Sequence, residues 1–383
     1  MIARWLFRRG SKYLAHAPER AERDLLRALA IRPDYPEAWL NLGNALSNQG
    51  DIQAARGCFY RAATLAPVSP EPLINASLAE LTLGNPDGWR LYEHRFSVPD
   101  FIERNGLKGG DRSKMWQGES LEGKTLLVFT EQGAGDTIMG LRYERALRGR
   151  YKAHRIVFRV PSSLYRLTKS SFRRFDWVEI VTDMERTPEY DALVPFLSLP
   201  YRCGMTNGAK YLDVYAGAPK FQFDPPLSGL KVGIVWAGSK WHKGDHKRSI
   251  PLELWYPLLD IPGVSFVSLQ AGERAQEAKQ FPQLRMIPHP VDFYDTARVM
   301  QSLDLVISVD SAPAHLAGAL GVPAWTLLPF VPDFRWQLGT ETTAWYKSMT
   351  LIRQTSRGDW AGVIERTRDQ LVSLANNRSK SAA

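Results

Sequence analysis

The sequence predicts two α/β domains with parallel sheets, preceded by an all-α segment of helical repeats. Residues 36–67 alternate large and small apolar side chains with a helical period. Two apolar runs, at 126–129 and 305–309, each end in a polar turn and then change to helical spacing. Strand and helix patterns alternate between 125 and 328, as in parallel sheets, whose ligands lie beyond the carboxyl ends of the strands.

Length and composition favour a soluble chain with several domains. The 383 residues carry 44% hydrophobic and 23% charged side chains, and no apolar run approaches the roughly 20 residues of a transmembrane helix. The basic N-terminus lacks the apolar core of a secretory signal, and Cys58 and Cys203 have no metal or redox spacing. We expect a cytoplasmic protein without a transmembrane segment.

The net charge of +9 suggests an acidic partner, such as a nucleotide or a lipid headgroup. No motif of the nucleic-acid-binding kind is present, so we expect no nucleic-acid partner. The basic N-terminus leaves a peripheral contact with a membrane surface open.

The N-terminal third matches a 34-residue tetratricopeptide repeat (TPR) at most signature positions, which include Trp39, Gly43, Ala55, Ala62 and Pro67. Gly43 is small where the two helices of a hairpin cross closely. Imperfect repeats flank this one, so we expect TPR-like repeats over residues 1–96, docked on the rest of the chain. Such repeats can hold a peptide or another subunit, or can act as a structural cap, and the sequence leaves both roles open.

The remaining chain divides at two segments without helix or strand periodicity. Residues 97–122 are polar and glycine-bearing, and residues 223–229 are rich in proline and glycine. We therefore expect a linker at 97–122, a first Rossmann-like domain at 123–222 and a second at 230–375. The strand patterns lie near 125–130, 155–160, 177–182, 191–196, 230–235, 264–269, 305–309 and 324–328. Helix patterns in the second domain lie near 252–260, 294–302, 313–320 and 359–375.

Two strand-to-helix turns are the strongest functional signals. The first is glycine-rich and contains Gly133, Gly135, Asp136 and Thr137, and the second runs from Asp310 to His315. Backbone N–H groups and the helix dipole at such turns favour an anion, most often a phosphate. Because the turns are more than a domain apart in sequence, we expect two facing domains with a ligand between them.

These turns, together with the Arg248-Ser-Ile-Pro251 segment between them, resemble the heptosyltransferase-like glycosyltransferases (family 9). Bacterial proteins that fuse TPRs to such a domain are more similar still. The resemblance covers about residues 36–375. It implies the GT-B fold, with an acceptor-side N-terminal half and a nucleotide-sugar-binding C-terminal half.

The resemblance also implies roles for individual residues. Asp136 matches the proposed general base; the alternative is that it only caps its helix. Gly133 and Gly135 permit a tight turn and close substrate approach. The donor pyrophosphate would lie against the second turn, and the guanidinium of Arg248 suits phosphate. The residues expected to bind substrate are Gly133, Gly135, Thr137, Ser239, Lys240, Arg248, Gln270, Asp310, Ser311 and His315.

Two departures from the family pattern leave the donor sugar open. Ile250 stands where heptosyltransferases have a tryptophan before the proline, and residues 237–247 form a longer and more basic turn. No Asp-x-Asp pair accompanies the cleft motifs, so we expect no metal and no cofactor besides the nucleotide-diphosphate sugar that serves as donor.

The sequence thus predicts a metal-independent, inverting glycosyltransferase acting on a protein or glycan acceptor that the repeats help to position. One alternative is an interaction scaffold with a TPR segment and an inactive GT-B fold. The other is a GT-B-fold sugar-nucleotide epimerase or hydrolase, which would need further carboxylates and histidines.

Overall fold

The computed structural model describes residues 1–107, 109–214, 221–287 and 290–382. It consists of two compact units, a helical unit of Met1–Gly110 with Phe330–Thr340, and an α/β unit of Asp111–Pro329 with Glu341–Ala383. Lys108, in the predicted linker, and residues 215–220, in the predicted first α/β domain, lie outside the described residues.

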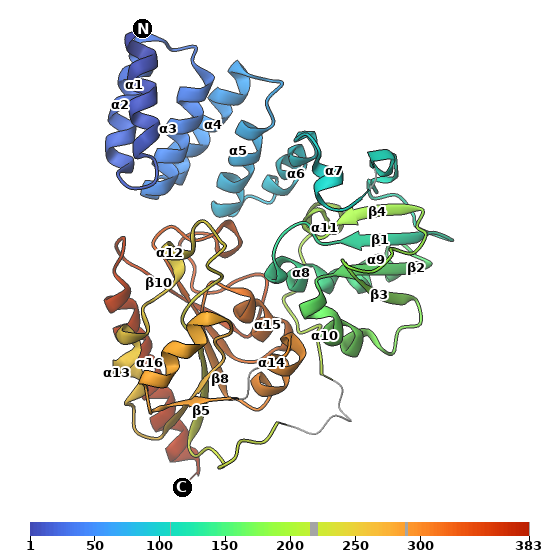
Figure 1. Cartoon of the computed structure of the whole chain (residues 1–383), viewed down its shortest axis with the longest axis vertical. Coiled ribbons are helices and arrows are strands. Elements are labelled where there is room, and N and C mark those ends of the chain that lie inside the picture. The colour runs from blue at the N-terminus through green and yellow to red at the C-terminus, as the bar shows by residue number, and fades with distance from the viewer. Residues whose placement is uncertain (108, 215–220, 288–289, 383) are drawn as a thin grey trace. The chain divides into compact units, whose positions relative to one another are not determined.

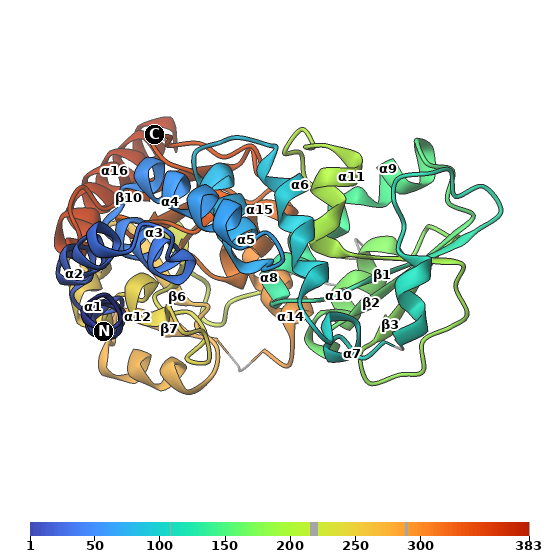
Figure 2. The same ribbon diagram turned by 90° about the horizontal axis from the view of Figure 1, so that it is seen from above.

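The helical unit is a row of helices in which each helix packs on the next, as Figures 1 and 2 show. Its main helices are α1 (Ile2–Tyr13), α2 (Pro18–Ile31), α3 (Pro36–Gln49), α4 (Ile52–Leu65), α5 (Glu71–Thr82) and α6 (Gly88–Tyr92). Proline opens α2 and α3, and Gly50 ends α3 in the left-handed conformation. A Cβ on Gly43 would lie 2.4 Å from the Phe59 ring of α4, which confirms the close helix crossing predicted there.

A segment from the C-terminal part of the chain completes the helical unit. In this insert, Phe330–Thr340, the Phe334 ring packs on Trp89 at a centroid distance of 5.6 Å, and Trp336 is fully buried. The backbone N–H of Leu338 donates to the carbonyl of Thr82 at 3.1 Å. The helical unit is therefore built from two stretches of chain that are more than 200 residues apart.

The first sheet of the α/β unit is fully parallel, with the order β3-β2-β1-β4. Its strands are β1 (Thr125–Phe129), β2 (Arg155–Val160), β3 (Val178–Thr182) and β4 (Ala192–Pro195). The helices that accompany it are α8 (Ala134–Gly140), α9 (Glu144–Gly149), α10 (Ser162–Phe172) and α11 (Leu199–Cys203). Strands β1, β2 and β4 are short and largely buried, as expected inside a parallel sheet, whereas the edge strand β3 is mostly half-buried.

The second sheet is also parallel, with the order β10-β9-β8-β5-β6-β7, the arrangement of a doubly wound Rossmann sheet. Its strands are β5 (Leu230–Val235), β6 (Val264–Ser268), β7 (Leu284–Met286), β8 (Leu305–Val309), β9 (Ala324–Leu328) and β10 (Met349–Arg353). The helices include α12 (Asp245–Arg248), α13 (Tyr256–Leu259), α14 (Phe293–Met300), α15 (Ala312–Leu320) and α16 (Trp360–Ala382). Two Rossmann-like sheets after a helical segment confirm the predicted fold class, the GT-B architecture.

The core of the second sheet extends onto the last helix. Val363, Ile364 and Leu371 of α16 are buried together with Trp255 and the apolar side chains of β5 and β8. Among the described residues, no helix is both long enough and apolar enough to cross a bilayer.

Candidate functional site

The parallel sheets point to two places where a ligand would bind. In such sheets ligands occupy the crevice beyond the carboxyl ends of the strands, where the strand order reverses. In the first sheet this point lies between β1 and β4, and in the second it lies between β5 and β8. The predicted site residues follow β1, β5, β6 and β8, so the fold gathers them at these carboxyl ends.

Asp136 sits at the start of the helix after β1. Its carboxylate Oδ2 accepts the backbone N–H of Gly133 at 3.1 Å, while its own N–H donates to the Gly133 carbonyl at 3.1 Å. This reciprocal arrangement caps α8 and fixes the carboxylate. The side chain is only half-buried, so it combines a defined position with access from solvent.

Thr137 is oriented differently from its neighbour. The residue is fully buried, and its hydroxyl oxygen lies 2.9 Å from that of Thr130 at the end of β1. The structure therefore places Thr137 inside the fold, where it joins the first turn of α8 to the strand before it.

The polar side chains of the turn after β8 are buried. Asp310, Ser311 and His315 are each less than 10% exposed. The Ser311 hydroxyl donates to the Val309 carbonyl at 3.1 Å and lies 3.1 Å from the Ser308 hydroxyl. Ser311 is thus the N-cap residue of α15 by position, but its side chain bonds backward into the strand end.

The two turns meet because α8 packs against α15 (Figure 1). A Cβ on Gly135 would lie 2.9 Å from Cδ2 and 3.5 Å from Nε2 of His315, and 3.6 Å from the Cα of Ala312. Only glycine allows this approach without displacing the imidazole. The structure thus brings the glycine-rich turn of the first sheet to the histidine turn of the second, as the sequence predicted for facing domains.

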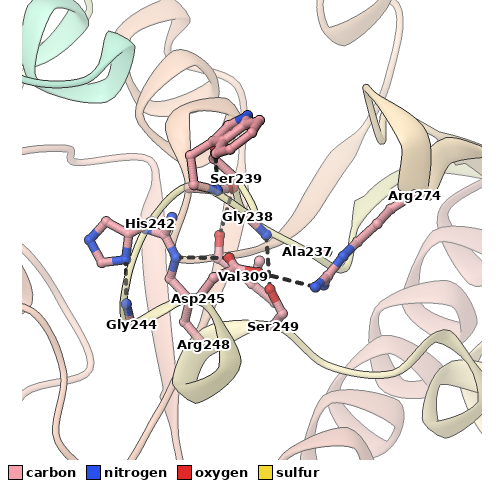
Figure 3. Close-up of polar contacts among 12 residues, drawn as sticks. Ala237, Gly238, Ser239, His242, Gly244, Asp245, Arg248, Ser249, Arg274 and Val309 are labelled. Carbon is pink, nitrogen blue, oxygen red and sulfur yellow. Dashed lines mark hydrogen bonds and ion pairs between the residues drawn. The ribbon is translucent and has the colours of Figure 1, made fainter.

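Arg248 lies in a charged cluster beyond β5, which Figure 3 shows. Its Nε lies 3.4 Å from Oδ1 of the buried Asp245, and Arg274 Nη2 lies 3.2 Å from Oδ2 of the same carboxylate. A Cβ on Gly238 would come within 2.7 Å of the Arg248 guanidinium. Two guanidinium groups therefore share one carboxylate, and the cluster keeps a net positive charge.

Gln270, at the end of β6, holds the backbone of this loop. Its side-chain oxygen accepts the N–H groups of Trp236 at 3.1 Å and Ala237 at 3.0 Å, and its amide nitrogen donates to the Ala237 carbonyl at 3.1 Å. The Gly238 N–H donates in turn to the Ser249 hydroxyl at 3.0 Å. Gln270 is therefore committed to shaping the turn after β5, and these bonds leave it little reach toward a nucleotide.

Ser239 and Lys240 have exposed side chains. The Lys240 ammonium pairs with Glu273 at 2.5 Å, and the Ser239 hydroxyl accepts the Trp241 N–H at 3.4 Å. Both side chains lie on the outer part of the loop. Arg248, by contrast, is only 18% exposed and lies inside the loop next to Asp245.

More positive charge surrounds this end of the second sheet. Burial, followed by the nearby charge of Arg357, lowers the pKa of Lys247, and burial lowers the pKa of Arg353 at the end of β10 to about 10. Cations held close together in a partly desolvated place favour an anionic ligand, which would relieve their repulsion.

Sequence reasoning missed three residues that organise the site. Asp245 lies within the basic run, where its acidic character was a usable signal. Arg274 and Tyr346 gave none, because only the fold brings them to Asp245 and His315, respectively. In the described part of the chain, no group of three or more His, Cys, Asp or Glu side chains is placed to hold a metal ion.

Comparison with known families agrees with both parts of this architecture. Residues 25–57 match the tetratricopeptide repeat family, and residues 270–355 match glycosyltransferase family 9 (heptosyltransferase). Protein FlbA of Caulobacter vibrioides is 30% identical over 393 residues, covering 91% of this chain and 63% of FlbA. The chain thus spans less than two thirds of the length of this relative.

Solved structures of glycosyltransferases resemble the chain at low sequence identity. ADP-heptose lipopolysaccharide heptosyltransferase II of E. coli is 17% identical, with a TM-score of 0.45, and covers 67% of this chain and 99% of its own. A family 9 glycosyltransferase of Veillonella parvula is 12% identical, with a TM-score of 0.46, and covers 68% and 98%.

The family matches fall on the helical repeats and on the carboxyl-edge turns of the second sheet. The second match includes Gln270, Asp310, Ser311 and His315. The chain therefore combines tetratricopeptide repeats with a domain of the glycosyltransferase family 9 (heptosyltransferase) type.

Proposed function

We propose that this protein transfers a sugar from a nucleotide-diphosphate donor to a hydroxyl group of a protein or glycan acceptor, with inversion and without a metal ion. The observation that carries the proposal is the contact between α8 and α15. Because Gly135 has no Cβ, the His315 ring can lie directly against its backbone. This contact brings the one half-buried carboxylate of the predicted set to the turn of the family 9 segment.

In the proposed chemical step, Asp136 acts as the general base. Its carboxylate removes the proton from the acceptor hydroxyl while the hydroxyl oxygen forms a bond to the anomeric carbon of the sugar. The bond from that carbon to the phosphate oxygen breaks, and the electron pair leaves with the nucleoside diphosphate. The hydrogen bond from Gly133 fixes the carboxylate for this attack.

The second sheet would stabilise the leaving group. Negative charge accumulates on the pyrophosphate as its bond to the sugar breaks, and the Arg248 guanidinium together with the first N–H groups of α15 can offset that charge. The Asp245–Arg274 arrangement holds Arg248 in place before the ligand arrives. These cations would do the work that a divalent ion does in metal-dependent transferases.

The helical unit supports a role in acceptor binding. Tetratricopeptide repeats bury their own core and leave one side for a partner. We propose that this side receives the protein or glycan acceptor, and that the protein works in the cytoplasm, with nucleic acid excluded as a partner.

A ligand screen tests the proposal directly. The melting temperature of the full chain is measured with nucleoside diphosphates, the matching nucleotide sugars, and inorganic phosphate as the control. A ligand that binds the folded state at about 100 times its Kd stabilises that state by about 2.7 kcal/mol, so the melting temperature should rise by a few degrees. We expect one nucleotide series to give this rise and inorganic phosphate to give none.

The outcomes separate the alternatives. If no nucleoside diphosphate or nucleotide sugar stabilises the protein, the transferase proposal is wrong and the scaffold interpretation gains support. If a nucleotide sugar binds and is hydrolysed or epimerised without transfer to any acceptor, the chain is a hydrolase or an epimerase.

A further inference from the structure

The outer face of α1 carries cations that no acidic group neutralises. Arg4, Arg8 and Lys12 follow one another at intervals of four residues, so their side chains lie on one side of the helix. All three side chains are exposed, and in the described part of the chain none of them has an ion-pair or hydrogen-bond partner. Like charges in such a row repel one another, and contact with an anionic surface relieves that repulsion.

The opposite side of α1 is taken up by the fold. Ala3, Leu6 and Gly10 are buried, and a Cβ on Gly10 would lie 3.0 Å from the side chain of Leu25 on α2. α1 lies at one end of the row of helices, with α2 packed against it (Figure 1). The contact with α2 therefore fixes which face of α1 is turned to solvent, and that face is the basic one.

Large apolar side chains accompany these cations at the surface. Ile2 and Trp5 of α1 are 67% and 56% exposed, and Met1, just before the helix, is fully exposed. Exposed apolar groups are unfavourable in water, whereas at a lipid–water interface tryptophan and apolar side chains enter the headgroup region beside lysine and arginine. The same side of α1 therefore offers both positive charge and apolar side chains.

Trp5 is held in its exposed position by a neighbouring ion pair. The Arg9 guanidinium lies 4.3 Å from the centroid of the Trp5 ring, and the Arg9 Nε donates to Oδ2 of the buried Asp24 at 2.7 Å. Asp24 thereby neutralises Arg9 and fixes it against the indole. Because a side chain that is already ordered loses little conformational freedom on binding, Trp5 is prepared for a partner that accepts an aromatic ring.

The basic–aromatic face of α1 consists of Met1, Ile2, Arg4, Trp5, Arg8 and Lys12. We propose that this face binds the surface of a bilayer that contains anionic lipids, with α1 lying along that surface. Each cation near such a surface strengthens binding about fivefold, so the three cations together give about 150-fold. Such attachment does not depend on sugar transfer, because it uses no residue of the α/β unit.

An acidic protein is the other kind of partner that these charges could attract. Such a protein would have to place carboxylates opposite the three cations and an apolar pocket opposite Ile2 and Trp5, all in one fixed arrangement. A bilayer supplies both kinds of contact to any helix that lies on it, because its headgroups and acyl chains rearrange around the side chains. The combination of cations with an ordered, exposed tryptophan therefore favours the lipid surface.

Co-sedimentation of the full chain with vesicles tests the proposal. One set of vesicles is phosphatidylcholine alone, and the other contains about one third phosphatidylglycerol, which supplies the anionic headgroups. We expect binding to the second set only, and weaker binding as the salt concentration rises, because salt screens the attraction. Failure to bind the anionic vesicles at low salt would overturn the proposal, and equal binding to both sets would contradict the role of the cations.

A pair of charge variants locates the contact. Arg8→Gln/Lys12→Gln removes two cations from the basic–aromatic face and should weaken binding to the anionic vesicles by about 30-fold, with a nearly unchanged melting temperature. Arg61→Gln/Arg90→Gln is the matched control, because these exposed cations lie on α4 and α6 and their loss lowers the net charge equally. The control should bind like wild type. Equal losses in the two variants would show that only the net charge matters and would overturn the assignment to α1.

Trp5→Ala measures the apolar part of the contact. At high salt this variant should lose most of the binding that remains in wild type, because apolar contacts are not screened. Trp241→Ala is its control, since Trp241 is 85% exposed and also lies beside a cation, with Lys240 Nζ 5.4 Å from its ring centroid. Equal behaviour of the two variants would contradict the role given to Trp5. Stronger binding of soluble poly-glutamate than of the anionic vesicles would assign the face to an acidic protein and overturn the lipid proposal.

Discussion

The turns after β1 and β8 have the same strand-to-helix layout but hold their carboxylates in opposite ways. Asp136 is half-buried and reaches back to the N–H of Gly133, whereas Asp310 is only 7% exposed. An accessible carboxylate can exchange a proton with a substrate, while a buried one is held by the fold around it. Under the proposed function, this contrast favours the first turn for the proton transfer and the second turn for building the donor side.

The largest effect that would break this comparison is expected at Asp136. Asp136→Asn keeps the shape and the helix cap but removes the proton acceptor, so transfer should fall by about 10²–10⁴-fold. Donor affinity and melting temperature should stay close to wild type, because asparagine caps helices about as well as aspartate. Turnover, nucleotide affinity and thermal melting on the same variant provide the measurement.

Asp51→Asn is the matched control, since Asp51 caps α4 by accepting the N–H of Ala54 at 3.0 Å. It should leave transfer unchanged. Normal turnover in a folded, donor-binding Asp136→Asn variant would reduce Asp136 to a cap and remove the difference between the turns.

The donor side gives the next largest effect. Arg248→Ala removes a charged hydrogen-bond donor from the enclosed loop and should weaken nucleoside diphosphate binding by about 1.5–3 kcal/mol, roughly 10–150-fold. Lys240→Ala should lose much less, because that ammonium is exposed and already pairs with Glu273. Calorimetry with the nucleoside diphosphate identified by the screen measures both, and equal losses would contradict the separation drawn between them.

The contact between the turns can be tested by adding one methyl group. Gly135→Ala places a Cβ against His315 and Ala312, and such overpacking costs about 1–3 kcal/mol. Gly149→Ala is the control, because a Cβ there meets nothing within 4 Å. Thermal melting should show a clear loss for the first variant and little change for the second. Equal stability of the two would mean that α8 and α15 do not pack as described.

The smallest effect concerns buried and exposed carboxylates in the helical unit. The hydrogen bond from Arg9 lowers the pKa of Asp24, whose Oδ2 lies 2.7 Å from the Arg9 Nε. The stabilisation is therefore present above the unfolded pKa of about 4 and is lost as the pH falls through the lower, folded pKa. Asp24→Asn should lower the melting temperature of the helical unit by a few degrees at pH 7, with the gap closing in acid.

Asp34→Asn, which disturbs the exposed pair with Arg32, should show neither effect. A pH-independent difference between Asp24→Asn and wild type would show that packing, and not ionisation, stabilises the α1–α2 contact.

Periodicity in the sequence was enough to predict most strands and the repeat. Strands β1, β2, β5, β8 and β9 are mostly apolar runs bounded by polar turns, and their described limits agree with the pattern within a residue or two. Two edge strands escaped notice: β7 has three residues, and β10 pairs only with β9. A strand of three residues such as β7 leaves a weak pattern, whereas β10 has five residues and buries Met349, Leu351 and Ile352.

The direction of individual side chains was beyond sequence reasoning. Thr137 and Gln270 belong to the predicted turns, but their side chains serve the fold. The Thr137 hydroxyl contacts Thr130 in the interior, and the Gln270 amide binds the backbone of the loop after β5. Motif positions identify which turn a residue occupies, but its hydrogen-bond partners come from distant segments. Tyr346 illustrates this limit. It follows His315 by 31 residues in the sequence, and it reaches the imidazole because Gly318 has no side chain in the way of its ring.

The insert at Phe330–Thr340 changes how the protein can be taken apart. The polypeptide passes between the helical unit and the α/β unit three times. The repeats are therefore not an independent N-terminal domain joined to the rest by a single linker. A protease that cuts once between α6 and β1 should leave the two fragments associated on a native column, held by the buried Phe334 and Trp336. A chimera that exchanges the repeats between related proteins would have to include both Met1–Gly110 and Phe330–Thr340. If only the N-terminal stretch were exchanged, Phe334 and Trp336 would lose the residues that they pack against.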